Sequence, residues 1–263
     1  MDYQISDIRY IVKSGNKLLF KRVADRLAFL DTPPEYISRA GEEFLIQSKE
    51  YRYIAYETDS ELLDLPNGYV WYGLREAYSF IDSSDYSCAA KALELLYWDA
   101  GSKFCGRCGS SMQRSTDISK KCTACANEIF AQVSPAVIVL VRRGREALLV
   151  HARNFTRPVF GLVAGFVETG ESLEECVARE VLEETSLSVR NISYVASQAW
   201  PYPNSLMLAF TADYASGELA FADGELIAGG FFTPENLPQL PPHPSIARSL
   251  IEAWLEETRH NYT

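Results

Sequence analysis

The chain has no apolar run long enough to cross a bilayer. Its hydrophobic stretches are all short, whereas a membrane-spanning helix needs roughly 18 consecutive apolar residues. The amino-terminal stretch MDYQISDIRYIVKSGNKLLF carries acidic side chains before its first apolar run and lacks the basic start of a signal peptide. We therefore expect a cytoplasmic protein that has no membrane partner.

Basic residues are also in short supply. The sequence has 25 lysines and arginines against 35 aspartates and glutamates, which gives a formal net charge of −10. General nucleic-acid binders and membrane-surface binders usually present a basic face, so this deficit argues against both classes. An anionic small substrate is still compatible if metal ions screen the site. The chain also lacks internal repeats and low-complexity tracts.

The first part of the chain, residues 1–100, is predicted to be a mixed, β-rich domain. Strand-length apolar runs separated by Gly, Asn, Pro and Asp favour β-structure, and here they cover residues 8–20, 43–47, 51–57 and 69–80. Residues 83–101 change to helical spacing, which is set by Ala89, Leu93, Leu96 and Tyr97. Because no chemically suggestive cluster occurs here, we expect a scaffold or dimerisation domain.

The second half, residues 131–263, alternates predicted strands with two helices. Apolar strand segments recur between residues 136 and 232, and helices are expected over residues 172–185 and 245–260. This order predicts a mixed α/β (α+β) fold for the half of the chain that holds the chemically suggestive residues.

Between these parts, residues 101–130 contain two matched cysteine pairs. CGRC and CTAC are separated by thirteen residues, a spacing typical of a tetrahedral, structural zinc site. A redox dithiol is the alternative, but no βαβ pattern surrounds the pairs. We therefore predict a zinc ribbon with one Zn²⁺ per chain, held by Cys105, Cys108, Cys122 and Cys125. The ribbon's basic residues are interpreted as a solvated face: Lys103, Arg107, Arg114, Lys120 and Lys121.

The segment GFVETGESLEECVAREVLEETSL, Gly165 to Leu187, holds seven glutamates and one arginine. On a helix, Glu180, Glu183 and Glu184 fall on one third of the circumference. The side chains predicted to face a core are Val177, Ala178, Val181 and Leu182. Arg179 lies beside Glu183 and can reach Glu171 in the preceding loop. A solvated acidic face explains Glu174 and Glu175, whereas clustered carboxylates suit Mg²⁺, which bridges carboxylates to phosphate oxygens.

This segment resembles the Nudix box, Gly-x5-Glu-x7-Arg-Glu-U-x-Glu-Glu-x-Gly-U, in which U is aliphatic. Its positions are matched by Gly165, Glu171, Arg179, Glu180, Val181, Glu183, Glu184 and Leu187, and Ser186 replaces the second Gly. The resemblance implies a Nudix fold and a hydrolase of nucleoside diphosphates linked to another group. It also implies that Glu180, Glu183 and Glu184 bind catalytic Mg²⁺ or Mn²⁺, and that a helix carboxylate or a separate glutamate acts as base.

The later stretch SQAWPYPNSLM resembles the signature of the NADH pyrophosphatase branch, with Ala199 for Pro and Tyr202 for Phe. This resemblance implies cleavage of NAD(H) to nicotinamide mononucleotide and AMP, removal of the NAD cap from RNA, and a homodimer. By the same resemblance, Phe130 and Phe166 sandwich an aromatic ring of the dinucleotide. The implied pocket is lined by Ile138, Gln198, Ser205, Met207 and Ala247. The resemblance also implies that Trp200 reaches this pocket from the loop of the dimer partner.

The resemblance further assigns Glu225 as a metal-binding or catalytic glutamate, although a surface glutamate after Asp-Gly is a rival interpretation. His151 and His243 are interpreted as incidental. Two other functions stay open. A broader Nudix hydrolase of ADP-ribose or other dinucleotides is permitted by Ala199. A non-catalytic nucleotide sensor with a nucleic-acid-binding ribbon is disfavoured by the intact glutamates.

Overall fold

The computed structural model describes residues 8–32, 35, 37–59, 65–155, 157–221 and 224–261. The chain divides into two compact units. The first runs up to Gln132 and also includes the loop Pro201–Asn204, and the second comprises Val133–Trp200 and Ser205 onward. No helix within the described ranges has the length and apolar character needed to span a membrane.

The first unit is built on a six-stranded sheet whose order is β3-β2-β1-β5-β4, with β6 paired to β2. Strands β1 and β5 run parallel, and the other neighbours are antiparallel. The bounds are β1 Ile8–Ser14, β2 Lys17–Val23, β3 Arg26–Ala28, β4 Ala40–Gln47, β5 Arg52–Glu57 and β6 Tyr69–Tyr72. The expected β-rich domain is therefore present.

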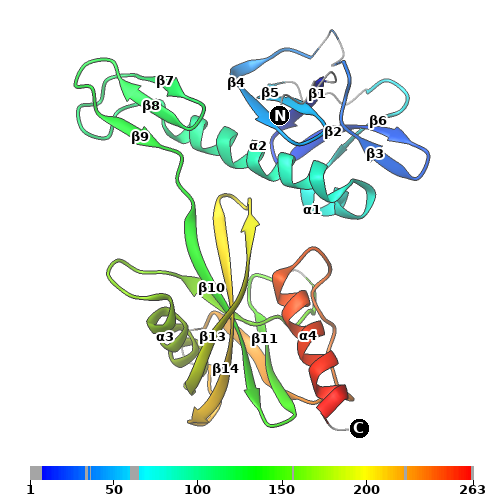
Figure 1. Ribbon diagram of the computed structural model, residues 1–263, viewed down its shortest axis with the longest axis vertical. Helices are drawn as coiled ribbons and strands as arrows, with labels where there is room; N and C mark the ends of the chain where they lie inside the picture. The colour runs from blue at the N-terminus through cyan, green and yellow to red at the C-terminus, as the bar shows by residue number, and fades with distance from the viewer. Residues whose placement is uncertain are drawn as a thin grey trace. The chain divides into compact units, whose positions relative to one another are not determined.

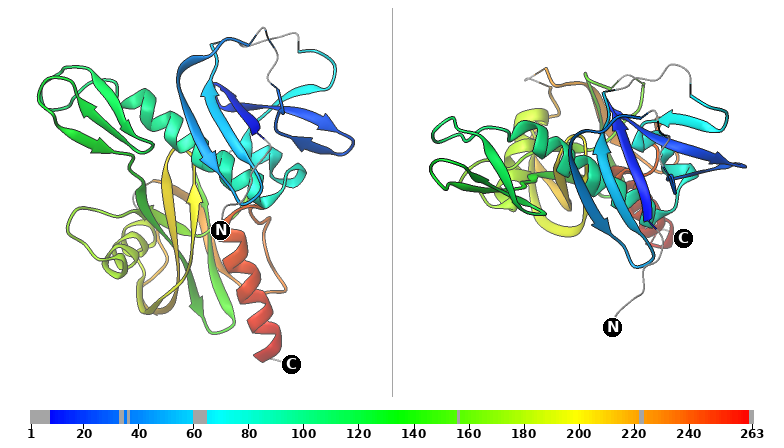
Figure 2. Two further views of the ribbon diagram at one scale, coloured as in Figure 1. Left: turned by 45° about the horizontal axis from the view of Figure 1, so that its top comes forward. Right: turned by 90° about the horizontal axis from the view of Figure 1, so that it is seen from above.

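Helix α2 (Ser83–Gly101) packs along one face of this sheet (Figure 1, Figure 2). It starts and ends at the predicted residues, and Ala89 and Leu96 are buried in the core that it shares with the sheet. Tyr97, predicted at the same helical spacing, is exposed instead. Asp85 is buried in the first turn of α2, where it accepts hydrogen bonds from Arg9 and Tyr53 and so ties the helix to β1 and β5.

The apolar run over residues 69–80 is only half strand. After β6 the chain turns at Gly73 into a short helix α1 (Leu74–Ala77) and a 3-10 turn η1 (Tyr78–Phe80). Leu74 and Ala77 bury their side chains in the α2 core, so tertiary packing outweighs the β propensity of this tyrosine-rich segment.

The cysteine-containing region forms a small sheet of β7 (Met112–Thr116), β8 (Ser119–Cys122) and β9 (Glu128–Phe130). Its basic residues do not all face solvent as predicted. Lys120 is only 4% exposed, and its ammonium pairs with Asp99 at 2.8 Å and donates to the carbonyl of Asp99 at 2.9 Å. Arg114 donates to the carbonyl of Glu43. These two side chains join the ribbon to α2 and β4 within the first unit.

The second unit is a mixed sheet covered by one helix on each face (Figure 1). Strand order is β13-β14-β10-β11-β15, with β12 also paired to β10. The bounds are β10 Ser134–Arg143, β11 Glu146–Ala152, β12 Val163–Phe166, α3 Leu173–Thr185, β13 Ser188–Trp200, β14 Ser205–Ser216, β15 Leu226–Phe232 and α4 Ile246–Asn261. Every strand and helix predicted between residues 131 and 263 is present.

The sequence of strand β10 explains why the sheet is covered by a helix on both faces. Val137, Val139 and Val141 point to the core under α3, whereas Ile138 and Leu140 point to the core under α4. Successive side chains of a strand face opposite sides of the sheet, so a strand covered on both faces is apolar throughout. The run AVIVLV therefore marks the centre of the sheet, and the elements that carry the candidate site are fixed on either side of it.

Candidate active site

The four paired cysteines converge on one point in the first unit. Their Sγ atoms all lie within 4.8 Å of one another, with separations of 3.7 Å from Cys105 to Cys125 and 3.5 Å from Cys108 to both Cys122 and Cys125. Hydrogen bonds from Ser110 lower the pKa of the Cys108 thiol, which favours the thiolate form that binds metals. In Cys125 the Asn127 backbone lowers the pKa, but hydrogen bonding with the other thiols raises it by more. The cluster can hold a metal ion, and it is a site separate from the acidic helix.

The acidic helix α3 begins and ends with defined caps. Ser172 accepts a hydrogen bond from the backbone N–H of Glu175, while the Glu175 carboxylate accepts from the backbone N–H of Ser172, which is a capping box. Ser186 ends the helix in the left-handed region at φ 60°, the conformation that the Gly of the Nudix box supplies. The departure at Ser186 is therefore accommodated without a change of cap geometry.

Arg179 holds the acidic side chains together. Its guanidinium donates to both carboxylate oxygens of Glu171, at 2.6 and 3.0 Å, and to the carbonyl of Phe166 at 3.0 Å. A further nitrogen donates to Glu180 at 2.8 Å and to Glu183 at 3.1 Å. Arg179 lowers the pKa of Glu171 to about 2 by this hydrogen bonding. The predicted contacts of Arg179 with Glu183 and Glu171 are present, and Glu180 and Phe166 join them.

Glu180 packs directly against the backbone of Gly165. A Cβ at position 165 would lie 1.9 Å from the Glu180 carboxyl carbon, so any side chain there would displace the carboxylate. Burial raises the pKa of Glu180, and the charges of Glu183 and Glu225 raise it further while Arg179 opposes them. The structure thus gives a physical reason for glycine at this position, which the sequence pattern alone left unexplained.

The faces of α3 differ in one respect from the prediction. Val177 and Val181 are buried as expected, but Leu182 is 53% exposed and does not face the core. Glu184 is instead buried at 5% exposure, on the same side as Val181. Since residues three and seven apart recur on one helix face, the core stripe runs through Val177, Val181 and Glu184.

Glu171, Glu180 and Glu183 bond to Arg179, and they do not converge with Glu184 on one common point. Within the described ranges, the four cysteines form the one group of three or more potential ligands that all lie within 4.8 Å of one another. Glu180 and Glu183 share Arg179, and Glu184 is buried on the side of Val181. Glu225, the residue before β15, raises the pKa of Glu180 through its charge. These four carboxylates nevertheless offer the oxygen ligands that divalent cations prefer.

The predicted pocket residues gather at one end of the sheet in the second unit. In register, Ala136 of β10 is paired with Phe166 of β12 and with Met207 of β14, and Met207 is paired with Gln198 of β13. Two positions further along the same strands, Ser205 is paired with Trp200. Ile138, Met207 and Ala247 contribute to one apolar cluster under α4. Phe166 is 58% exposed at the end of β12, where its ring is available for stacking.

Gln198 has a structural role that its sequence position did not reveal. Its amide donates to the carbonyl of Pro244 at 3.0 Å, and its carbonyl accepts from the backbone N–H of Ile246 at 2.8 Å. Both bonds join β13 to the start of α4. The signal was hidden because the partners lie 46 and 48 residues away in the chain.

Two other predicted residues belong to the first unit or its loop. Phe130 ends β9 in the first unit and is 53% exposed, whereas Phe166, expected with it on either side of a dinucleotide ring, belongs to the second unit. Tyr202 of the Pro-rich loop has its hydroxyl 3.4 Å from that of Tyr86, and Arg75 stacks over its ring at 4.6 Å. Tyr202 was considered only as an aromatic replacement for Phe, and sequence reasoning missed this packing role.

Comparison with protein families gives two matches. The model described as NUDIX domain matches residues 132–254, and the model described as NADH pyrophosphatase-like rudimentary NUDIX domain matches residues 8–98. The first unit, predicted from its sequence as a scaffold, is thus itself similar to a reduced Nudix domain.

Comparison with individual proteins adds relatives across much of the chain. The NAD-capped RNA hydrolase NudC of Stutzerimonas stutzeri is 42% identical over 193 residues, which are 73% of this chain and 70% of that protein. The NAD-capped RNA hydrolase NudC of Pectobacterium atrosepticum is 42% identical over 168 residues, which are 64% of this chain and 65% of that protein. A crystal structure of a NUDIX hydrolase from Nitrosomonas europaea has a TM-score of 0.53 at 22% identity, covering 60% of this chain and 93% of that one.

Proposed function

Because this chain belongs to the NADH pyrophosphatase and NAD-capped RNA hydrolase branch of the Nudix hydrolases, we propose that it cleaves the pyrophosphate bond of NAD(H) into nicotinamide mononucleotide and AMP. The same bond joins NAD to the 5′ end of NAD-capped RNA, so the proposal includes removal of that cap to leave a 5′-monophosphate. The observation that carries it is the packed Glu171–Arg179–Glu180 arrangement beside Gly165.

We propose Glu180, Glu183, Glu184 and Glu225 as the residues that hold Mg²⁺ or Mn²⁺. Burial and neighbouring carboxylates disfavour the charge of Glu180, and a divalent cation would offset that unfavourable charge density. When bound, the metal supplies stabilisation of charge on the pyrophosphate and activation of water. Arg179 keeps Glu180 and Glu183 oriented toward the same side of α3, and Glu184 and Glu225 are the candidates for accepting the proton of the attacking water.

The dinucleotide is proposed to lie at the end of the sheet where the predicted pocket residues gather. Phe166 offers an exposed ring for stacking on a base. Ile138, Met207 and Ala247 form the apolar floor. Gln198 acts by fixing the start of α4, which carries Ala247.

Zinc is the metal that we propose for the cysteine cluster. In a tetrahedron with Zn–S bonds of about 2.3 Å, neighbouring sulfurs lie about 3.8 Å apart. The observed separations of 3.5 to 3.7 Å are close to that value. Four thiolates leave no open coordination position, so a structural role for one Zn²⁺ follows, and residues 101–130 are proposed as a zinc ribbon between the 1–100 and 131–263 domains.

We also propose that the protein is a cytoplasmic homodimer. Strand β13 is an edge of its sheet and exposes Tyr194 and Val195, and a second copy can cover such an edge. In this arrangement, Trp200 at the end of β13 reaches the site of the other protomer. Analytical ultracentrifugation of the full chain tests the dimer, and a monomer at micromolar concentration contradicts it.

Product analysis tests the reaction. The protein is incubated with Mg²⁺ or Mn²⁺ and, separately, with NADH, NAD-capped RNA and ADP-ribose, and products are separated by chromatography. Nicotinamide mononucleotide, AMP and 5′-monophosphorylated RNA are expected, with NADH turned over faster than ADP-ribose. Preferred turnover of ADP-ribose supports the broader Nudix hydrolase, and nucleotide binding without any turnover supports the sensor.

A further inference from the structure

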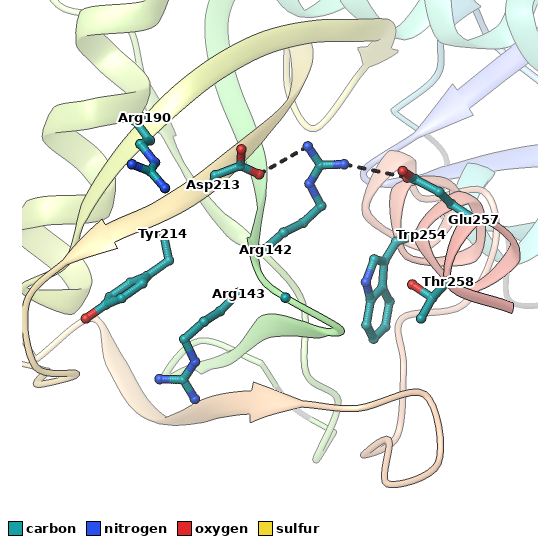
Figure 3. Close-up of a pocket in the computed structure, with 9 residues that line it drawn as sticks. Arg142, Arg143, Arg190, Asp213, Tyr214, Trp254, Glu257 and Thr258 are labelled. Carbon is teal, nitrogen blue, oxygen red and sulfur yellow. Dashed lines mark ion pairs between the residues drawn. The ribbon is translucent and has the colours of Figure 1, made fainter. Parts of the chain in front are cut away.

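A cavity lies within the second unit, away from the acidic helix. It has a volume of about 370 Å³ and is formed where the end of β10, strands β13 and β14, and the last turns of α4 meet (Figure 3). Arg142 is five residues further along β10 than Val137, which pairs with Gly165, and this corresponds to about 17 Å along the strand. The cavity is therefore distinct from the candidate active site.

Two residues that line this cavity, Arg142 and Trp254, each have a buried donor without an acceptor among the described residues. Arg142 Nε and Trp254 Nε1 are both inaccessible to solvent and have no hydrogen-bond partner in the described part of the chain. Trp254 is only 4% exposed, and Figure 3 shows its indole nitrogen on the ring edge that faces Arg142. A buried polar group without a partner costs about 1–3 kcal/mol, so these donors indicate an acceptor that completes them.

The charge around the cavity favours an anion. Arg142, Arg143 and Arg190 contribute three guanidinium groups, although the chain as a whole has a net charge of −10. The two carboxylates present, Asp213 and Glu257, pair with the terminal nitrogens of Arg142 at 3.2 and 3.6 Å (Figure 3). Those nitrogens are engaged, whereas Nε is not.

Arg190 adds a positive charge to the cavity. It is exposed and makes no ion pair with any residue that the structure describes. Arg143 differs, because it pairs with Glu146 at 2.9 Å and stacks over Phe231 at 3.8 Å. The positive charge available to a ligand therefore comes mainly from Arg190 and from the remaining face of Arg142.

The donors suit a tetrahedral anion. Arg142 Nε, Trp254 Nε1 and the hydroxyl of the buried Thr258 come from two elements, β10 and α4, and a phosphate group presents three acceptor oxygens to such a set. Arginine is the side chain best suited to phosphate recognition. The cavity is larger than one phosphate group requires, so it can also admit a small organic substituent.

We propose that this cavity binds the phosphate group of a small phosphorylated molecule, with Arg142, Trp254 and Thr258 as hydrogen-bond donors and Arg190 as the attracting charge. The site is independent of the proposed hydrolysis, because none of its residues belongs to the Nudix box or the pocket around Phe166. The phosphate can come from free inorganic phosphate or from a mononucleotide, and the test distinguishes these sources.

The test uses the indole N–H signals of the full-length protein in ¹⁵N-resolved NMR without divalent metal. The chain has 4 tryptophans, and Trp254→Phe identifies the Trp254 signal. Inorganic phosphate, AMP and adenosine are titrated separately. We expect a saturable shift of the Trp254 signal with phosphate or AMP and none with adenosine. Tighter binding of AMP identifies a mononucleotide as the ligand, and equal or tighter binding of inorganic phosphate identifies free phosphate.

Arg190→Gln changes an exposed residue, so this variant should fold like the parent. It is expected to weaken the binding measured at Trp254 a few-fold at low salt, because an exposed charge acts through screened attraction. Trp254→Phe, read by calorimetry, is expected to weaken binding roughly tenfold. Arg145→Gln, an exposed arginine outside the cavity, is the control that leaves binding unchanged.

Three results overturn the proposal. One is a Trp254 signal that moves with neither phosphate nor AMP at millimolar concentration. Another is an equal shift with adenosine, which would remove the phosphate requirement. The third is phosphate binding that is unchanged in both Arg190→Gln and Trp254→Phe.

Discussion

The Arg179 guanidinium forms a two-bond ion pair with Glu171, with Nη2 2.6 Å from Oε1 and Nε 3.0 Å from Oε2. The pair joins the middle of α3 to the loop before it. The same guanidinium also reaches Glu180 and Glu183, so one side chain determines the positions of three carboxylates. Bidentate arginine–carboxylate pairs combine geometric precision with strength, and this one links the loop to the acidic face of α3.

The stability of the fold at acid pH should depend on the ion pair between Glu171 and Arg179. The folded-state pKa of Glu171 is about 2, below its ordinary value of 4.5. A lowered pKa stabilises the fold fully above the ordinary value, and this contribution is lost as the pH falls toward 2. We expect Glu171→Gln to be less stable than the parent near pH 7 and to show a shallower loss of stability between pH 4.5 and 2.

Urea unfolding midpoints measured across this pH range, with a chelator for divalent metal, check the prediction. Glu174→Gln, an exposed glutamate on the same helix, is the control that should keep the parent's slope. If the unfolding midpoints of Glu171→Gln and the parent fall equally between pH 4.5 and 2, the ion pair does not stabilise the fold.

Gly165→Ala should separate folding from catalysis. Its Cβ would lie 1.9 Å from the Glu180 carboxyl carbon, so the carboxylate must move by an ångström or more. A misplacement of this size costs about 100-fold in rate. We expect kcat to fall by that factor and the metal concentration for half-maximal activity to rise, which steady-state kinetics with varied Mn²⁺ would measure.

Gly101→Ala is the matched control, because a Cβ at residue 101 meets no atom within 4 Å. It should retain the parent's activity. If Gly165→Ala also keeps full activity, Glu180 does not need the position that it has in the structure.

Gln198→Glu should destabilise the second unit. The substitution keeps the acceptor for the Ile246 N–H but replaces the donor to the Pro244 carbonyl with a second carboxylate oxygen. Loss of one partner in a half-buried hydrogen bond costs about 1–2 kcal/mol. The free energy of unfolding in urea measures this, and the exposed Gln113→Glu serves as control. Equal stability of the two variants would refute the link between β13 and α4.

Metal removal should act on stability and leave the chemistry of α3 unchanged. The cysteine cluster lies within the ribbon, and Lys120 joins the ribbon to α2. A chelator that strips Zn²⁺ is therefore expected to lower the melting temperature. Initial rates at low temperature, with Mg²⁺ restored, should stay within about twofold because the cluster lies outside α3. Loss of activity before any loss of folded protein would assign the cluster a direct catalytic role.

Much of the second unit could be predicted from the sequence because its signals are local. The continuous apolar run AVIVLV and the helical spacing over residues 172–185 depend on near neighbours. Leu182 was assigned to the core wrongly, because amphipathic spacing does not say which of two adjacent arcs a sheet covers. The resulting burial of Glu184 depends on that packing.

Long-range contacts set the limit of sequence reasoning elsewhere. Lys120 was expected in solvent, but Asp99 and the Ser102 carbonyl surround it in the fold. Gln198 and the anion cavity depend on segments that are far apart in the chain, and no short pattern signals them. The short helix α1 within the run 69–80 likewise follows from the α2 core that buries Leu74.

The most direct test of the central claim is NADH turnover with Mn²⁺ by Glu184→Gln, measured beside Glu174→Gln. The account predicts that Glu184→Gln stays folded with its zinc content intact but loses nearly all formation of nicotinamide mononucleotide and AMP, whereas Glu174→Gln matches the parent. Equal turnover by the two variants would contradict the assignment of α3 as the metal-binding catalytic helix.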